Sequence, residues 1–227
     1  MAKESESVSA NRRPRAMVEE IVVIGGGGHA RAVVSILQKL DRFRILGYTD
    51  LKDHGPLLGI PYLCDDGGLK AIAAGTKRRN AVLAVGQVGL GLLREKISSN
   101  LRALNLAFPP IVSKDSIVNA GAVVADGLVV MDGAVVNVGA KLGQYAIVNT
   151  NCTIEHDSVL EDWVHVASGA TVCGGVTIGR HSMIGAGATV IEGIKIAADC
   201  IVGAGATVVE DIIDSGVYVG CPARRIK

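Results

Sequence analysis

The amino-acid sequence predicts a small α/β domain followed by a parallel β-helix built from six-residue repeats. Three observations support this fold class. Between residues 112 and 208, Val, Ile or Leu recurs at every sixth position. Residues 21–108 instead alternate short apolar runs with amphipathic stretches, and a Gly-rich turn follows the first run. Hydrophobic residues make up 49% of the 227 residues but aromatic residues only 3%, which is typical of a narrow core filled by aliphatic side chains.

The repeat determines the architecture of the second half. A run of this length has a chance probability on the order of one in a billion. Six is a multiple of the strand period of two, so each hexad supplies one short strand and one turn, and three hexads close a triangular coil. A small residue often stands two positions earlier and fills the corner. The aliphatic side chains that point into the prism are Val112, Val118, Val124, Val130, Val136, Leu142, Val148, Ile154, Leu160, Val166, Val172, Ile178, Ile184, Val190, Ile196, Val202 and Val208.

The outward positions of the hexads decide between two uses of such a prism. A structural rod or an ice-binding surface would favour long rows of identical outward residues. The outward residues here are mixed, as His156, Trp163, His165, Arg180 and Lys195 show. His156 and His165 therefore face solvent or a neighbouring subunit, and the bulky Trp163 suggests a subunit interface.

The first half predicts a βαβαβ pattern. Strands are expected at residues 21–24, 45–49 and 81–85, and helices at about 31–40, 67–74 and 90–104. Pro109 and Pro110 mark the change to hexads. We therefore expect a mobile tail at residues 1–20, an α/β domain at 21–108, and a β-helix with a C-terminal tail at 109–227.

The Gly-rich turn indicates a phosphate-binding site. Gly25, Gly27 and Ala30 fit the pattern G-x-G-x-x-A, and the acidic Asp50 follows at the end of the second strand. Glycines allow the backbone to approach a phosphate, and the unpaired N–H groups of the helix N-terminus attract that anion. Fewer than ninety residues and three strands favour a nucleoside diphosphate over a dinucleotide. The alternative is that the glycines only form a tight turn.

Charge and composition exclude several classes of protein. Lys and Arg number 23 and Asp and Glu 22, and this balance argues against nucleic acid or an anionic membrane as the main partner. The longest apolar stretch, residues 81–93, is too short to span a bilayer. The first twenty residues lack the pattern of a signal peptide. Five cysteines without a C-x-x-C pair favour reduced thiols, so we expect a cytoplasmic protein without membrane insertion.

The combination of the two halves resembles a known family, the hexapeptide-repeat sugar O-/N-acyltransferases. The resemblance rests on the motifs IGGGGHA at residues 24–30, NTNCTIEHD at 149–157 and GVYVGCPAR at 216–224. The most similar members are the N-acetyltransferases of nucleotide-linked 4-amino-4,6-dideoxy sugars of the bacillosamine and perosamine type. This resemblance implies a left-handed β-helix and a homotrimer. It also implies acetyl-CoA bound between neighbouring β-helices and a nucleotide-linked amino sugar bound by the N-terminal domain.

The resemblance also assigns roles in the acetyl transfer. His156 matches the proposed general base, and Asp157 would orient its imidazole. Asn149 and Glu155 resemble residues of the acceptor pocket, and His165 resembles a histidine at the thioester end of acetyl-CoA. Imidazole suits this role because a sugar amine is mostly protonated near neutral pH and must lose a proton to attack a thioester.

Further residues match binding positions of the family. Gly174, Ala186 and Ala204 correspond to backbone positions along the acetyl-CoA groove. The nucleotide-sugar contacts correspond to Gly27, Gly28, His29, Asp50 and Gly86. The fourth glycine of the turn departs from the family, which often has a small side chain there.

Three alternatives remain open. The same fold could O-acetylate a sialic acid-like sugar, or serve as a non-catalytic nucleotide-binding scaffold. A zinc enzyme of the γ-carbonic anhydrase type would need three converging histidines. His156, His165 and His181 are 9 and 16 residues apart and do not share one position of the eighteen-residue coil. We therefore expect no metal.

Overall fold

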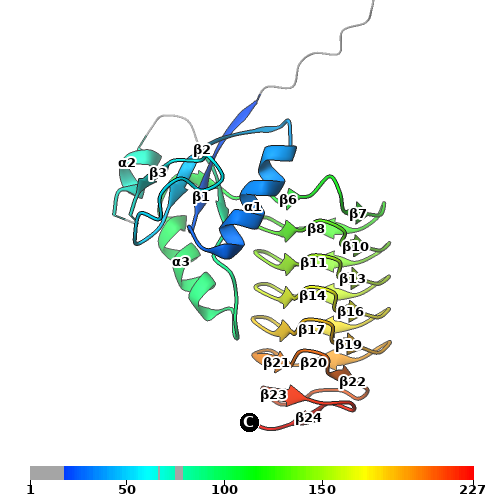
Figure 1. The fold of residues 1–227 in the computed structure, drawn as a ribbon. Coiled ribbons are helices and arrows are strands. Elements are labelled where there is room, and N and C mark those ends of the chain that lie inside the picture. The colour runs from blue at the N-terminus through cyan, green and yellow to red at the C-terminus, as the bar shows by residue number, and fades with distance from the viewer. Residues whose placement is uncertain (1–17, 66, 75–78) are drawn as a thin grey trace, which may run out of the picture.

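The computed structural model describes residues 18–65, 67–74 and 79–227. Figure 1 shows an α/β domain that lies beside the first coils of a long β-helix, with α3 running down along it. The fold class predicted from the sequence is confirmed, and the architecture is consistent with a left-handed β-helix. Most of the expected N-terminal tail lies outside the described residues, and the first strand begins at Glu19.

The α/β domain contains one parallel sheet with the strand order β3-β2-β1-β4-β5. The three expected strands are present as β1 (Glu19–Ile24), β2 (Phe43–Thr49) and β4 (Arg79–Leu83). The three expected helices are α1 (Gly28–Lys39), α2 (Leu69–Ala73) and α3 (Leu92–Arg102).

Two strands of this sheet were not expected from the sequence. These are β3 (Tyr62–Cys64) and β5 (Leu106–Ala107), which form the two edges of the sheet. The expectation of three strands was therefore wrong. Two or three residues are too few to show an alternating pattern, and these strands are defined by pairing with their neighbours.

The strand order places a binding edge next to the Gly-rich turn. The direction of the order reverses at β1, because β2 follows on one side of it and β4 on the other. In open parallel sheets, ligands bind outside the carboxyl ends of the strands at such a reversal. Gly25 follows β1 and Gly86 follows β4, so both lie at this edge.

The β-helix has three faces, and successive strands of one face are eighteen residues apart in the chain. Val136, for example, pairs with Ile154 of the next coil. The first face holds β6 (Ile111–Val112), β9 (Val129–Val130), β12 (Ile147–Val148), β15 (His165–Val166), β18 (Met183–Ile184), β21 (Cys200–Val202), β23 (Gly216–Val219) and β24 (Arg224–Arg225). The second face holds β7 (Ile117–Val118), β10 (Val135–Val136), β13 (Thr153–Ile154), β16 (Thr171–Val172), β19 (Thr189–Val190) and β22 (Thr207–Val208). The third face holds β8 (Val123–Val124), β11 (Lys141–Leu142), β14 (Val159–Leu160), β17 (Thr177–Ile178) and β20 (Lys195–Ile196).

Three edges join these faces. The first edge connects the first and second faces and carries Thr150, Ser168, Ala186 and Ala204. The second edge connects the second and third faces and carries His156 and Gly174. The third edge returns the chain to the first face and carries Asp162 and Arg180. The second edge is thus the edge that does not border the first face.

The turns at these edges repeat a left-handed backbone conformation. One residue per hexad has a positive φ, and in most hexads it is glycine, which adopts this conformation without steric cost. In the other described turns, a residue with a larger side chain has the positive φ. These are Tyr145, Asn151, Asp157, Trp163, His181 and Asp199. Non-glycine residues in this conformation often mark functional or tightly packed sites.

The first face is covered by the α/β domain. Ile111, Val129 and Met131 pack into one core with α1. Trp163 is only 2% exposed, and its ring stacks on Tyr145 with centroids 4.3 Å apart. The expectation that Trp163 lies at a subunit interface was therefore wrong, because the chain's own N-terminal domain covers it.

Two salt bridges also hold the α/β domain against the first coils of the β-helix. Lys39, the last residue of α1, lies 2.7 Å from Asp115 and 2.6 Å from Asp132.

None of the helices in the described part of the chain has the length and apolar character needed to cross a bilayer.

Candidate functional site

The Gly-rich turn leaves the N-terminus of α1 open. Gly27 is its N-cap, and no side chain caps the first N–H groups. Gly27 and Gly28 are exposed, and a Cβ added at either residue would meet no atom within 4 Å. The space above the helix N-terminus is therefore open to an anionic ligand. Gly26 differs, because a Cβ there would lie 2.7 Å from Cε2 of Tyr48.

Asp50 closes this turn from the neighbouring strand. Its Oδ2 accepts a hydrogen bond from the Gly26 N–H at 2.6 Å, and its Oδ1 accepts one from the Leu51 N–H at 2.6 Å. His54 Nε2 lies 3.8 Å from the same carboxylate. The residue thus lies at the predicted nucleotide site, where it also shapes the turn.

His29 and Gly86 meet across the ends of β1 and β4. A Cβ added at Gly86 would lie 3.2 Å from the Cβ of His29. Burial lowers the pKa of His29 to about 3, and the nearby Arg94 and His165 add to this effect. His29 is therefore neutral at pH 7, and its Nε2 has no hydrogen-bond partner among the described residues.

His156 stands at the second edge, in a turn whose left-handed residue is Asp157. Its Nδ1 lies 3.0 Å from Oδ2 of Asp157, and its side chain is 52% exposed. The hydrogen bond to Asp157 raises the pKa of His156, and the charges of Asp157, Glu155 and Glu192 act in the same direction. Gly174 lies one coil further, and a Cβ there would come within 2.6 Å of His156 Nε2. The exposed imidazole thus rests against a surface that only glycine leaves free.

Glu155 ends a short ladder of polar side chains on successive coils. Asn119 Nδ2 donates to Asn137 Oδ1 at 2.7 Å, and Asn137 Nδ2 donates to Glu155 Oε2 at 2.8 Å. The ladder fixes the Glu155 carboxylate beside His156. The structure therefore brings together His156, Asp157, Glu155 and Gly174.

His165 lies apart from this group and is not open to solvent. It is only 6% exposed, because the loop after β4 crosses the first face above it. Its Nδ1 lies 3.1 Å from the Gln87 carbonyl oxygen, and its Nε2 lies 3.1 Å from Asn149 Nδ2. The expectation that His165 faces solvent or a neighbouring subunit was wrong. The side chain points away from the prism interior, as expected, but the same chain covers it.

The other predicted acetyl-CoA contacts divide between two edges. Ala186 and Ala204 are exposed neighbours on the first edge, whereas Gly174 lies on the second edge beside His156. Within one chain, therefore, these three residues do not form a single groove.

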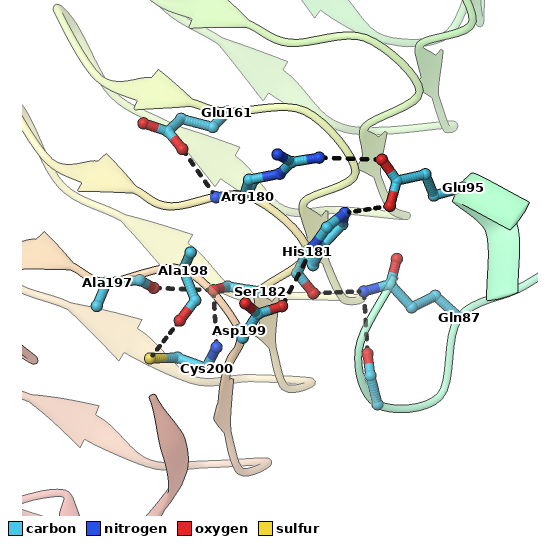
Figure 2. Close-up of polar contacts among 11 residues, drawn as sticks. Gln87, Glu95, Glu161, Arg180, His181, Ser182, Ala197, Ala198, Asp199 and Cys200 are labelled. Atoms are coloured by element: carbon cyan, nitrogen blue, oxygen red, sulfur yellow. Dashed lines mark hydrogen bonds and ion pairs between the residues drawn. The ribbon is translucent and has the colours of Figure 1, made fainter. Parts of the chain in front are cut away.

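The three histidines considered as zinc ligands do not converge. His181 Nδ1 lies 3.1 Å from Asp199 Oδ1, and Glu95 Oε2 lies 3.0 Å from its Nε2 as an ion-pair contact (Figure 2). His165 is held by Gln87 and Asn149, and His156 is on another edge. In residues 18–65, 67–74 and 79–227, no group of three or more His, Cys, Asp or Glu side chains is arranged to hold a metal ion.

Several residues at the domain contact were not identified from the sequence. Arg94 and Gln87 are buried, and Glu95 pairs with Arg180 at 3.0 Å and with His181. A sequence signal for Arg94 was present, since it lies at helical spacing with Ser98 and Leu101, which share the buried face of α3. A charged residue on a buried helix face indicates a specific partner.

Comparisons with known proteins agree with this architecture. The profile of the PglD N-terminal domain matches residues 20–101, and that of the bacterial transferase hexapeptide (six repeats) matches residues 175–210. The acetyltransferase domain of PglB from Neisseria gonorrhoeae is 31% identical, with a TM-score of 0.83. The alignment covers 92% of this chain and 100% of that domain. That domain is also known in complex with acetyl coenzyme A.

A second similar structure is a mutant of perosamine N-acetyltransferase from Caulobacter crescentus, in complex with CoA and GDP-perosamine. It is 30% identical, with a TM-score of 0.86, and the alignment covers 93% of this chain and 98% of that enzyme. The chain therefore belongs to the hexapeptide-repeat sugar acyltransferases that carry a PglD-type N-terminal domain.

Proposed function

We propose that this protein transfers the acetyl group of acetyl-CoA to the 4-amino group of a nucleotide-activated 4-amino-4,6-dideoxy sugar, in the cytoplasm, for bacterial surface glycan synthesis. The observation that carries the proposal is the exposed His156–Asp157 pair on the β-helix together with an open helix N-terminus on the α/β domain. The similar gonococcal and Caulobacter proteins support it, since they bind acetyl-CoA and GDP-perosamine.

In the proposed reaction, His156 acts as the general base. The sugar ammonium group loses one proton to solvent, and the freed amine attacks the thioester carbon while neutral His156 accepts a second proton from the attacking nitrogen. A C–N bond forms, the C–S bond breaks, and the proton held by His156 passes to the departing CoA sulfur. Asp157 stabilises the imidazolium that forms between these steps, in line with the raised pKa of His156. Nucleotide phosphates would rest on the N–H groups at Gly27 and Gly28.

We propose that the site is shared between two subunits. The α/β domain covers the first face, and His156 stands on the edge opposite that face. A sugar held at the Gly-rich turn can therefore reach the His156 of a neighbouring chain more readily than that of its own chain. A homotrimer would also bring the first edge of one chain, with Ala186 and Ala204, against the second edge of the next, with Gly174. This arrangement would reunite the proposed acetyl-CoA contacts.

The first test is a thiol-release assay with acetyl-CoA and UDP-, GDP- and dTDP-linked 4-amino sugars. His156→Ala should lower kcat by about 10²- to 10⁴-fold, the usual cost of removing a general base, and leave acetyl-CoA binding intact. Full activity of this variant would refute the assignment. Activity on free sialic acid alone would support O-acetylation instead, and turnover with none of these acceptors would favour a binding scaffold.

A second test examines the shared site by complementation. Gly27→Asp places a carboxylate where phosphate is expected to bind, and His156→Ala removes the base. If the two groups act across a subunit boundary, mixed oligomers of the two inactive variants contain some intact sites. Activity of the co-expressed mixture above that of either variant alone is the expected result. Inactive mixed oligomers would place both groups in one chain.

A further inference from the structure

A chain of hydrogen bonds crosses from the α/β domain to the first edge, and the chemistry of its end groups sets its direction. The Gln87 carbonyl oxygen can only accept, so His165 Nδ1 donates to it at 3.1 Å. In a neutral imidazole the other nitrogen then accepts, and Asn149 Nδ2 donates to His165 Nε2 at 3.1 Å. Asn149 Oδ1 in turn accepts the N–H of Thr150 at 2.8 Å. The tautomer of His165 and the orientation of the Asn149 amide are therefore both determined.

Gln87, at the start of this series of hydrogen bonds, is itself held in place by several contacts. Its side chain is buried, and Nε2 donates to the carbonyl oxygens of Gly89 at 2.9 Å and His181 at 3.3 Å (Figure 2). Its Oε1 accepts from Arg94 Nη1 at 3.3 Å. These bonds join the loop to α3 and to the β-helix together. The Gln87 carbonyl oxygen therefore has a fixed place above the first face.

The surroundings keep His165 uncharged. Burial is the main cause that lowers the pKa of His165 to about 4, and the charge of Arg94 adds to it. The Arg94 guanidinium lies 5.8 Å from the centre of the Trp163 ring and is itself only 1% exposed. Within the described residues it has no carboxylate partner. An uncompensated positive charge in a buried site opposes protonation of any nearby imidazole.

Asn149 is left with one unused donor. An amide nitrogen carries two N–H groups, and the second one on Asn149 makes no hydrogen bond within the described residues. The side chain is half-buried beside Thr150, which lies two coils before Ala186 in the first-edge column that continues to Ala204. The free N–H therefore lies on the same edge of the β-helix as the proposed acetyl-CoA contacts Ala186 and Ala204.

We propose that His165 is a positioning residue that acts through Asn149, so that the amide presents its free N–H to an acceptor oxygen of the bound reactants. That oxygen belongs to the acetyl carbonyl or to the sugar. This inference rests on the proposed function and revises one expectation drawn from the sequence: both ring nitrogens of His165 are already occupied, so Asn149 makes the contact expected of His165.

A double-mutant cycle tests the dependence of one residue on the other. His165→Ala and Asn149→Ala should each lower kcat/KM by about 10-fold or more, the size expected for one lost hydrogen bond in the transition state. In the Asn149→Ala background, His165→Ala should have no further effect. An equal loss in both backgrounds would overturn the proposal. A rise in KM for acetyl-CoA or for the sugar identifies which reactant supplies the oxygen.

The conservative variant separates positioning from proton transfer. In His165→Gln, the new amide oxygen can still accept from Asn149, whereas the side chain cannot shuttle a proton. Activity well above that of His165→Ala is the expected result. If His165→Gln is as impaired as His165→Ala, His165 takes part in the reaction by its own chemistry and the proposal fails.

A spectroscopic measurement tests the hydrogen-bond chain without any catalytic assay. In ¹⁵N-histidine NMR of the unmodified protein, the His165 signals, assigned by their loss in His165→Gln, should show a proton on Nδ1. They should not titrate between pH 8 and 5.5. An Nε2–H tautomer, or titration near the ordinary histidine pKa of about 6.5, would refute the proposed series of hydrogen bonds from Gln87 through His165 to Asn149. This result does not depend on the acceptor sugar, so it distinguishes failure of this inference from failure of the proposed function.

Discussion

Gly174 provides the most direct test of how the His156 site is built. A Cβ at this position would lie 2.6 Å from Nε2 and 2.7 Å from Cε1 of His156. Ordinary contacts between such atoms are about 3.5–4.0 Å, so Gly174→Ala must displace the imidazole by about 1 Å. The ring is half exposed and can move without loss of packing, so we expect little change in Tm. The geometry of proton transfer, in contrast, should be lost.

The expected effect on catalysis follows from that displacement. A misplacement of about 1 Å can cost about 10²-fold in rate, which corresponds to about 2.7 kcal/mol of transition-state stabilisation. Steady-state thiol release at saturating acetyl-CoA measures kcat, and calorimetry measures Tm. A Gly174→Ala variant with the kcat of the unmodified protein would refute the placement of His156 as base against this glycine.

The adjacent Gly175 provides a matched control. Its φ is +66°, and a Cβ there would meet nothing closer than Gly193 Cα at 4.0 Å. Gly175→Ala should therefore destabilise the fold by about 1 kcal/mol through its left-handed backbone, and lower Tm by about 2–4 °C. Its kcat should stay unchanged. Gly174→Ala should thus lower kcat with little change in Tm, whereas Gly175→Ala should lower Tm with no change in kcat.

Further predictions concern charge and metal. Asp157 raises the pKa of His156, and the base must be deprotonated to act. Asp157→Asn should therefore move the acid limb of the pH profile of kcat/KM to lower pH. If the limb does not move, the ionisation belongs to another group. Lys39→Met removes the ion pairs with Asp115 and Asp132, so Tm should fall, by more at low salt than at high salt, and scans at two salt concentrations check this. Treatment with a chelator should leave the acetyl-transfer rate unchanged, whereas a loss restored by zinc would revive the zinc-enzyme alternative.

The β-helix was predictable because its code is local and repeated. Each coil stacks on the next with a shift of eighteen residues, so the same position meets the same position along the prism. An aliphatic side chain every sixth residue therefore specifies the core without knowledge of distant contacts. Most of these side chains are buried as expected. Val118, in the first coil, is partly exposed because no earlier strand stacks on it.

The α/β domain was predictable in outline only. Its central strands and helices have apolar patterns long enough to identify, and the Gly-rich turn marked the start of α1. The edge strands β3 and β5 were missed because they are short and depend on pairing with β2 and β4. The group of His156, Asp157 and Gly174 follows from hexad spacing, since His156 and Gly174 are one coil apart.

The sequence alone determined the aliphatic prism, the outward direction of His156 and His165, and the Gly-rich turn before α1. These features depend on periodicity and on turn chemistry within a few residues. Only the tertiary structure decided which outward residues stay accessible. His165 is buried by Gln87, 78 residues away in the chain, and the backbone carbonyl oxygen of His181 accepts a hydrogen bond from the side chain of the same Gln87, 94 residues away. A repeat specifies which way a side chain points from the prism, but the contact between domains decides what covers it.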